Sequence, residues 1–225
     1  MLAKRWGKRS DPFTDLALTL PIVTVYHLGV VFLPVRNAAD LVTDKLRSLA
    51  SYSILAYSAL ALCISLALVL VCAALAKSHP FRRDRFVRVI AEGALYAIVM
   101  RAVASTVVGR LALAQGTSFG PFGAVIMSFG AGFYEEVAFR VGLFGLGGKA
   151  LRRVWPDGRW LVPLAWAIVT SALFSAWHYF GPESFRLDTF VFRFTCGLVL
   201  TAIYAYRGFA TAVFTHALYD VWVLV

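Results

Sequence analysis

The sequence has few charged residues and few cysteines, and each shortage excludes a common class of protein. Only 15% of its 225 residues are charged and 60% are hydrophobic, whereas soluble domains have roughly 25% and 45–50%. The three cysteines, Cys63, Cys72 and Cys196, are an odd number, far apart and inside apolar stretches. They predict neither a disulfide framework nor a cysteine metal site. The composition indicates a polytopic membrane protein.

Long apolar runs recur along the chain, and about 20 such residues suffice to cross the roughly 30 Å hydrocarbon core of a bilayer. Only helices and closed barrels satisfy their backbone there, and the unbroken runs lack the alternation of barrel strands. We predict an all-α fold, a transmembrane helical bundle of seven to eight spans forming one integral-membrane domain, residues 1–225. The candidate spans are 14–35, 50–76, 89–110, 120–146, 160–180, 189–206 and 209–225.

Basic residues predict the orientation of the bundle. The net charge is +10, but Lys and Arg gather in alternate connections between spans. This positive-inside pattern places the N-terminus in the cytoplasm and explains the basicity by contact with anionic lipid, so no nucleic-acid partner is predicted. The four basic groups are Lys4, Arg5, Lys8 and Arg9; Lys77, Arg82, Arg83, Arg85 and Arg88; Lys149, Arg152, Arg153 and Arg159; and Arg207.

Three ionisable residues interrupt the apolar stretch FYEEVAFRVG, residues 133–142. A charged side chain at the bilayer centre costs at least about 2.5–3.5 kcal/mol on insertion scales, so this group needs partners or a function. Glu136 and Arg140 stand one helical turn apart and are expected to pair. Glu135 is rotated about 100° from Glu136 on a helix, and its partner must come from elsewhere in the bundle.

Two later spans supply polar residues that could face Glu135. The stretch LFSAWHYFG places His178 one turn after Phe174. The stretch FTHALYDVW places His216 one turn before Asp220. A water held between Glu135 and His178 would be an effective nucleophile, and His216 is the natural donor to the oxyanion that forms on a carbonyl. These roles describe peptide-bond hydrolysis without a covalent intermediate.

The same residues resemble the signatures of the CPBP family of intramembrane proteases. This family includes the type II CAAX prenyl endopeptidases and the bacteriocin-processing or Abi proteins. Residues 135–140 fit EExxxR, residues 174–178 fit FxxxH and residues 216–220 fit HxxxN/D, in the order of the family. The likeness covers residues 120–222 as a CPBP-like catalytic core, whereas residues 1–115 form N-terminal spans without a motif.

The resemblance implies an endopeptidase of the glutamic type. An ionised aspartate only accepts hydrogen bonds, so Asp220, where several members have asparagine, is expected to assist by orienting His216. The implied catalytic residues are Glu135, His178, His216 and Asp220, and the implied supporting residues are Glu136, Arg140 and Phe174.

Metal-independent hydrolysis is the predicted chemistry, and no cofactor is expected. The family has also been described as metalloproteases, so zinc held by Glu135, His178 and His216 stays an alternative. Against it, the sequence has no HExxH helix, and the two histidines lie on different spans. The other histidines, His27 and His79, are expected to be structural or interfacial.

The predicted substrate is a membrane-anchored or exported protein or peptide, because the site is expected to open to the non-cytoplasmic face. The predicted location is a bacterial inner (cell) membrane, with the lipid bilayer as the second partner. Two other functions stay open. A non-catalytic CPBP-like scaffold or regulator would share the fold, and a proton-coupled transporter would also use buried Glu, His and Asp.

Overall fold

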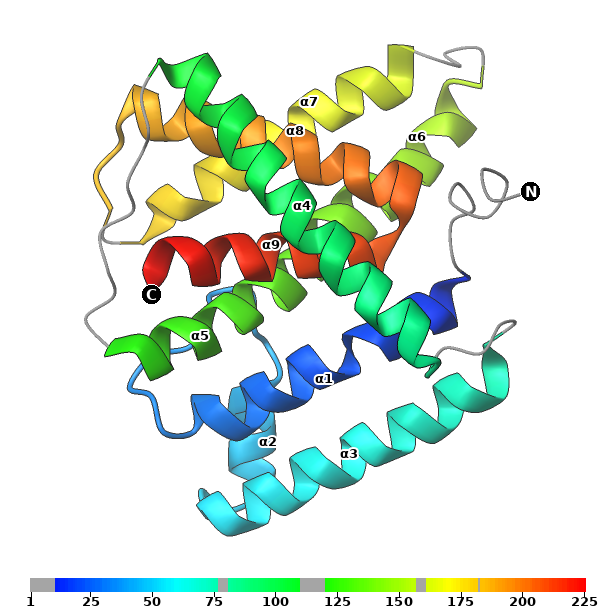
Figure 1. Ribbon diagram of the computed structural model, residues 1–225, viewed down its shortest axis with the longest axis vertical. Helices are drawn as coiled ribbons and strands as arrows, with labels where there is room; N and C mark the ends of the chain where they lie inside the picture. The colour runs from blue at the N-terminus through cyan, green and yellow to red at the C-terminus, as the bar shows by residue number, and fades with distance from the viewer. Residues whose placement is uncertain (1–10, 77–80, 110–119, 157–160, 182) are drawn as a thin grey trace.

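The computed structural model describes residues 11–76, 81–109, 120–156, 161–181 and 183–225 as an all-helical bundle without strands among them (Figure 1). The predicted all-α fold is confirmed. The elements are α1 (Pro12–Val30), α2 (Thr43–Leu49), α3 (Ile54–Leu75), α4 (Arg83–Val108), α5 (Gly120–Gly130), the π-helix η1 (Ala131–Gly147), α6 (Gly148–Val154), α7 (Leu161–Trp177), the 3₁₀ turn η2 (His178–Phe180), α8 (Leu187–Arg207) and α9 (Phe209–Leu224).

Each of the seven candidate spans corresponds to a long helix or to a continuous pair of helices. Within the described residues, α1, α3, α7 with η2, and α8 are long and apolar enough to cross a membrane by length and composition. The span predicted at 120–146 is α5 followed directly by η1. The helix of the first span ends at Val30 instead of residue 35. A loop at residues 31–42 then leads to the short helix α2, and this helix was not predicted from the sequence.

Successive long helices alternate in direction, which collects the described members of the four predicted basic groups at one end of the bundle. The start of α4, the short helix α6 and the end of α8 lie on the right of Figure 1, and we call this side the basic end. The end of α7, the start of α8 and the end of α9 lie on the left. Of the predicted basic groups, Lys4, Arg5, Lys8, Arg9, Lys77 and Arg159 lie outside the described residues.

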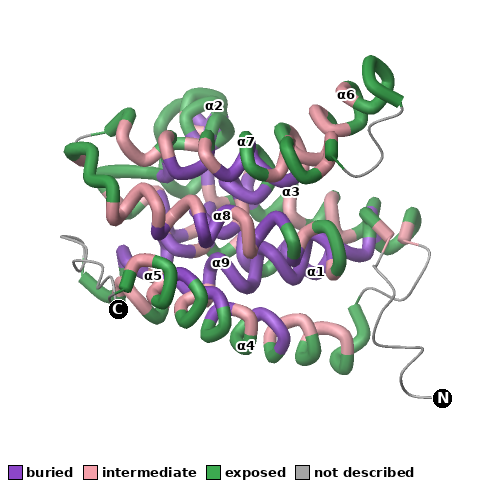
Figure 2. Tube along the Cα trace, turned by 90° about the horizontal axis from the view of Figure 1, so that it is seen from above, coloured by how far each residue is buried: buried purple, intermediate pink, exposed green. Residues whose placement is uncertain are grey.

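Helix α9 lies at the centre of the bundle and packs against α1, α4, α5, α8 and η1. Every residue from Phe209 to Ala217 is buried. Figure 2 shows that buried residues are concentrated in α9 and in the neighbouring turns of α1 and α8. Helix α3 lies at the edge of the bundle, and only 11% of its most apolar 18-residue stretch is buried. This difference fits a bundle in which α9 is enclosed by protein and α3 faces lipid.

A glycine permits the close approach of η1 to α9. A Cβ added at Gly132 would lie 2.6 Å from the Cβ of Ala217, far inside van der Waals contact. The two helices therefore touch one turn before the EExxxR motif on η1 and within the HxxxD motif on α9. This contact sets the distance between the glutamates and His216.

Candidate active site

The EExxxR stretch is wound as a π-helix, and its predicted ion pair is present. Arg140 Nη1 lies 3.0 Å from Glu136 Oε1, and both side chains are almost completely buried. Arg140 also donates from Nη2 to the Gly197 carbonyl at 3.3 Å and lies over the Phe174 ring, 4.3 Å from its centroid. The arginine thus joins η1 to α7 and α8. π-Helical turns occur frequently at functional sites.

His216 lies between carboxylates on both sides of its ring. Its Nδ1 is 2.8 Å from Glu136 Oε1, and its Nε2 is 3.5 Å from Asp220 Oδ2 and 3.9 Å from Glu135 Oε2. The structure therefore brings together the predicted residues of η1 and α9. The contact of Glu136 with His216 was not predicted, and it gives Glu136 a second role beside its pair with Arg140.

His178 is held by the end of its own helix. Its Nδ1 lies 3.0 Å from the Phe174 carbonyl oxygen, and because a carbonyl can only accept, Nδ1 carries the proton and donates. The Nε2 of a neutral ring is then an acceptor. In the described part of the chain no hydrogen bond joins His178 to Glu135, so the predicted partnership of these two residues requires a molecule between them.

A cavity of about 300 Å³ connects the histidines. Its lining includes His178, His216 and Asp220. Arg193 also lines it and forms a double hydrogen bond with Glu183, at 2.9 and 2.8 Å. The remaining lining residues are Met100, Phe174, Thr189, Phe192, Cys196, Leu200, Tyr219, Val223 and Leu224. The cavity lies at the end of the bundle opposite the basic end, because it is lined by the end of α7, the first turns of α8 and the end of α9.

Glu135 has a partner that sequence reasoning missed. Its Oε1 accepts a hydrogen bond of 2.8 Å from Nδ2 of Asn37, in the loop after α1. Its Oε2 is buried and has no hydrogen-bond partner among the described residues. No sequence signal connects the two residues, which are 98 positions apart.

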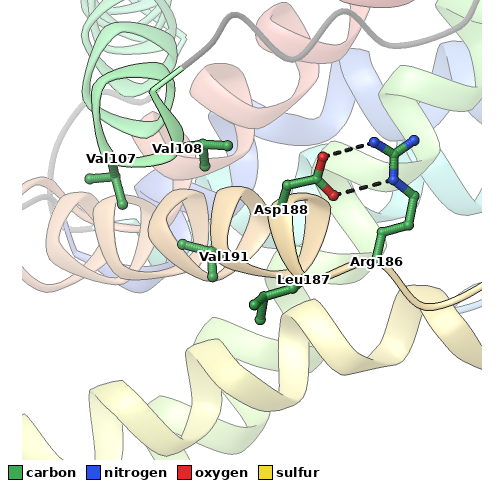
Figure 3. A pocket seen from close by; sticks show the side chains of 6 residues that line it. All are labelled: Val107, Val108, Arg186, Leu187, Asp188 and Val191. Carbon is green, nitrogen blue, oxygen red and sulfur yellow. Dashed lines mark hydrogen bonds and ion pairs between the residues drawn. The ribbon is translucent and has the colours of Figure 1, made fainter.

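Two further cavities contain none of the predicted catalytic residues in their linings. One, of about 530 Å³, lies between the end of α4 and the start of α8, with the Arg186–Asp188 ion pair at its edge (Figure 3). The other, of about 900 Å³, is mainly apolar and includes Lys149 and Arg152 of α6. The cavity beside His178 is therefore the candidate active site.

The residues of the alternative zinc site do not form a ligand set as they stand. Across the described ranges, no group of three or more His, Cys, Asp or Glu side chains is placed to hold a metal ion. Both ring nitrogens of His216 already face carboxylates. Glu135, His178 and His216 would have to rearrange before they could share a metal, so metal independence stays a prediction.

His27 has the structural role expected for it. Its Nδ1 lies 2.8 Å from the Tyr57 hydroxyl and its Nε2 lies 2.7 Å from the Tyr134 hydroxyl. These bonds join α1 to α3 and to η1, next to Glu135. His79 lies outside the described residues.

Comparison with known proteins supports the interpretation of this site. Residues 117–222 match the family model described as "Type II CAAX prenyl endopeptidase Rce1-like". This part of the chain is similar to the type II CAAX prenyl endopeptidases. The matched range contains every site residue predicted from the sequence, whereas Asn37 lies outside it. No curated protein and no solved structure matches the chain. Together with the apolar helices, this similarity supports an integral membrane protein related to the CAAX-type intramembrane proteases.

Proposed function

We propose that the protein is an intramembrane endopeptidase that hydrolyses a peptide bond with a water activated by Glu135 and His178. The observation that carries the proposal is the convergence of three motif helices on one site. His178, His216 and Asp220 line the same cavity. Glu135 is not part of the lining, but its Oε2 lies 3.9 Å from Nε2 of the lining residue His216. A cluster of this kind inside a membrane domain is costly and points to function.

The base in this mechanism is the free oxygen of Glu135. A water held by Glu135 Oε2 and His178 Nε2 gives a proton to the carboxylate as its oxygen attacks the carbonyl carbon of the substrate. The carbonyl π electrons move to its oxygen, which becomes an oxyanion. When the tetrahedral intermediate collapses, the C–N bond breaks and the protonated Glu135 returns the proton to the leaving amine.

His216 is the proposed donor to the oxyanion. Glu136 accepts the hydrogen bond from Nδ1, so a ring that carries both protons has its Nε2–H on the side of Asp220, which also lines the cavity. Asp220, 3.5 Å from Nε2, orients the ring and balances its charge. A donor of this kind is worth about 10²–10³-fold in kcat when it is already in place before the reaction.

The proposed substrate is a membrane-anchored or exported protein or peptide. The cavity lies at the end of the bundle opposite the basic end, and the positive-inside rule assigns the basic end to the cytoplasm. We therefore propose a site that opens to the non-cytoplasmic side of a bacterial inner membrane, with a cytoplasmic N-terminus. A prenylated CAAX substrate fits this orientation less well, because that cleavage takes place on the cytosolic side.

The direct test is cleavage of a panel of anchored peptides in proteoliposomes by wild type and Glu135→Gln. We expect the variant to lose at least about 10²-fold in rate, since it has no general base. Glu92→Gln is the matched control, because it removes a carboxylate paired with Arg207 at 2.6 Å, at the basic end of the bundle. It should retain the rate per folded molecule. Equal cleavage by Glu135→Gln would contradict the mechanism, and no cleavage by wild type would favour the scaffold.

The metal question has its own measurement. We expect exhaustive chelation to leave cleavage unchanged, because both nitrogens of His216 are engaged by carboxylates. Loss of activity on chelation followed by recovery with added zinc would overturn the metal-independent mechanism.

A further inference from the structure

We infer that Asn37 is a positioning residue for Glu135, supplied by a loop outside the region that matches the family. The inference rests on the proposed function, because it assumes that Glu135 is the base. Asn37 is 8% exposed, and its side-chain amide donates to Glu135 Oε1 at 2.8 Å. It is the one described side chain that hydrogen-bonds this carboxylate.

The orientation of the Asn37 amide is fixed by a second contact. Its Oδ1 accepts a hydrogen bond of 2.9 Å from the backbone N–H of Ala39. A backbone N–H can only donate and an ionised carboxylate can only accept, so the amide oxygen must face Ala39 and the NH₂ group must face Glu135. The contacts with Ala39 and Glu135 therefore both require the same orientation of the Asn37 amide group.

The loop that carries Asn37 is tied to the helices around the site. The Tyr26 hydroxyl donates to Asp40 Oδ2 at 2.7 Å and accepts from the Asn37 backbone N–H at 3.3 Å. Asp40 Oδ1 accepts from the backbone N–H groups of Val42 and Thr43, at 2.9 and 3.0 Å, where α2 begins. The amide of Asn37 is thus presented to η1 from a fixed backbone.

This hydrogen bond decides which oxygen of Glu135 is available for the water. With Oε1 held by Asn37, the unpartnered Oε2 is the oxygen nearer His216. Without Asn37, Glu135 could turn and bond directly to His216 Nε2. That contact would occupy the base and the oxyanion donor together, so Asn37 keeps these two groups apart.

Two substitutions at Asn37 separate positioning from a merely structural role. Asn37→Asp keeps the acceptor for Ala39 but replaces the donor by a second acceptor facing Glu135. Asn37→Ala removes both contacts. If Asn37 only shaped the loop, the aspartate variant would be the milder one. If Asn37 positions Glu135, the aspartate variant is the more severe one for catalysis.

The experiment measures kcat and KM for an anchored peptide in proteoliposomes. We expect Asn37→Ala to lower kcat about 10- to 100-fold with little change in KM, because the base is misplaced and the substrate cavity is intact. Asn37→Asp should lower kcat further. Asp44→Asn, which removes an exposed carboxylate paired with Arg36, should behave as wild type. Unchanged kcat in Asn37→Ala, or a milder effect of Asn37→Asp, would overturn the inference.

A thermal-unfolding cycle tests the contact without relying on catalysis. In the double variant Asn37→Asp/Glu135→Gln the donor and acceptor exchange places, since the introduced glutamine amide can donate to the introduced aspartate. We expect its unfolding midpoint to exceed that of Asn37→Asp alone, although it cleaves nothing. If the two single substitutions shift the unfolding midpoint by amounts that simply add in the double variant, the contact between Asn37 and Glu135 does not form. If the unfolding midpoints show that the two substitutions are coupled but the wild type cleaves no peptide, the contact between Asn37 and Glu135 stands and the proposed function is rejected.

Discussion

Glu136 illustrates how one residue can support both the fold and the site. It is fully buried, and the same oxygen lies 3.0 Å from Arg140 and 2.8 Å from His216 Nδ1. Buried ion pairs contribute little net stability when intact, but removal of one partner leaves a buried charge without compensation. The residue therefore couples the stability of η1 to the orientation of the proposed oxyanion donor.

Glu136→Gln is predicted to lose stability and activity together. Arg140 would keep a buried positive charge without its carboxylate, which costs about 3–5 kcal/mol. Thermal unfolding in nanodiscs and peptide cleavage are the two measurements. Asp84→Asn, which removes an exposed carboxylate beside Arg82, should change stability little. Undiminished stability of Glu136→Gln would show that the buried pair does not form in the membrane.

Asp220 is predicted to tolerate asparagine but not alanine. The amide oxygen of asparagine can still accept a hydrogen bond from His216 and orient its ring. We expect Asp220→Asn to cleave at a rate within about tenfold of wild type and Asp220→Ala to lose about 10²-fold, the scale of a mispositioned catalytic group. Rates measured at matched amounts of folded protein decide this. Equal loss in both variants would mean that the charge of Asp220 is required.

At the scale of elements, the contact between η1 and α9 determines the geometry of the site. Gly132→Ala is predicted to force the helices apart, because its Cβ would lie 2.6 Å from the Cβ of Ala217 and 2.8 Å from its backbone nitrogen. Overpacking of this kind costs about 1–3 kcal/mol, and here it also separates the glutamates from His216. Unfolding midpoint and cleavage rate should both fall.

Gly142→Ala on the same π-helix is the matched control for this prediction. A Cβ at Gly142 meets only the Val137 carbonyl, at 3.4 Å, which is ordinary contact. Its unfolding midpoint should stay close to that of wild type. If both alanine variants behaved alike, the close approach at Gly132 would not be what controls the site.

The loop after α1 is predicted to lose part of its attachment in acid. Burial raises the pKa of Asp40, but the hydrogen bonds from Thr43 and Tyr26 outweigh it and hold the pKa below its usual value. A depressed pKa in the folded state means that Asp40 stabilises the fold fully above about pH 4 and loses this contribution as the pH falls further. The difference in unfolding midpoint between wild type and Asp40→Asn should therefore be large at pH 7 and shrink in acid. A difference independent of pH would contradict this.

At the scale of the whole molecule, the alternation of helix direction makes the orientation testable. Phe185→Cys, in the exposed loop before α8, should react with a membrane-impermeant thiol reagent only from the non-cytoplasmic side. Ala150→Cys, in the exposed part of α6 at the basic end, should react only from the cytoplasm. Both variants are best made in a background without Cys63, which is exposed. The reverse labelling pattern would invert the proposed topology and place the site on the cytoplasmic side.

The sequence predicted the helical architecture and the pairing of Glu136 with Arg140, because apolar length and one-turn spacing are local signals. Motifs on separate spans also identified His178, His216 and Asp220, which line one cavity, although Glu135 is not part of that lining. The π-helical winding of η1 and the contact of Asn37 with Glu135 could not be predicted. Apolar periodicity does not report how tightly a helix is wound. The loop is placed by hydrogen bonds from Tyr26 to Asp40 and from Asn37 to Glu135, and the second of these joins residues 98 positions apart.

The central position of α9 has a consequence for the synthesis of the protein. This helix follows every other described helix along the chain, yet it is the one enclosed by the others. His216 and Asp220 both lie on it, so a nascent chain that has inserted only its earlier helices has Glu135 and His178 but neither residue of the oxyanion side. Under the proposed mechanism, a chain that has not yet inserted α9 therefore lacks the oxyanion side of the site, and we expect it to be inert toward neighbouring membrane proteins.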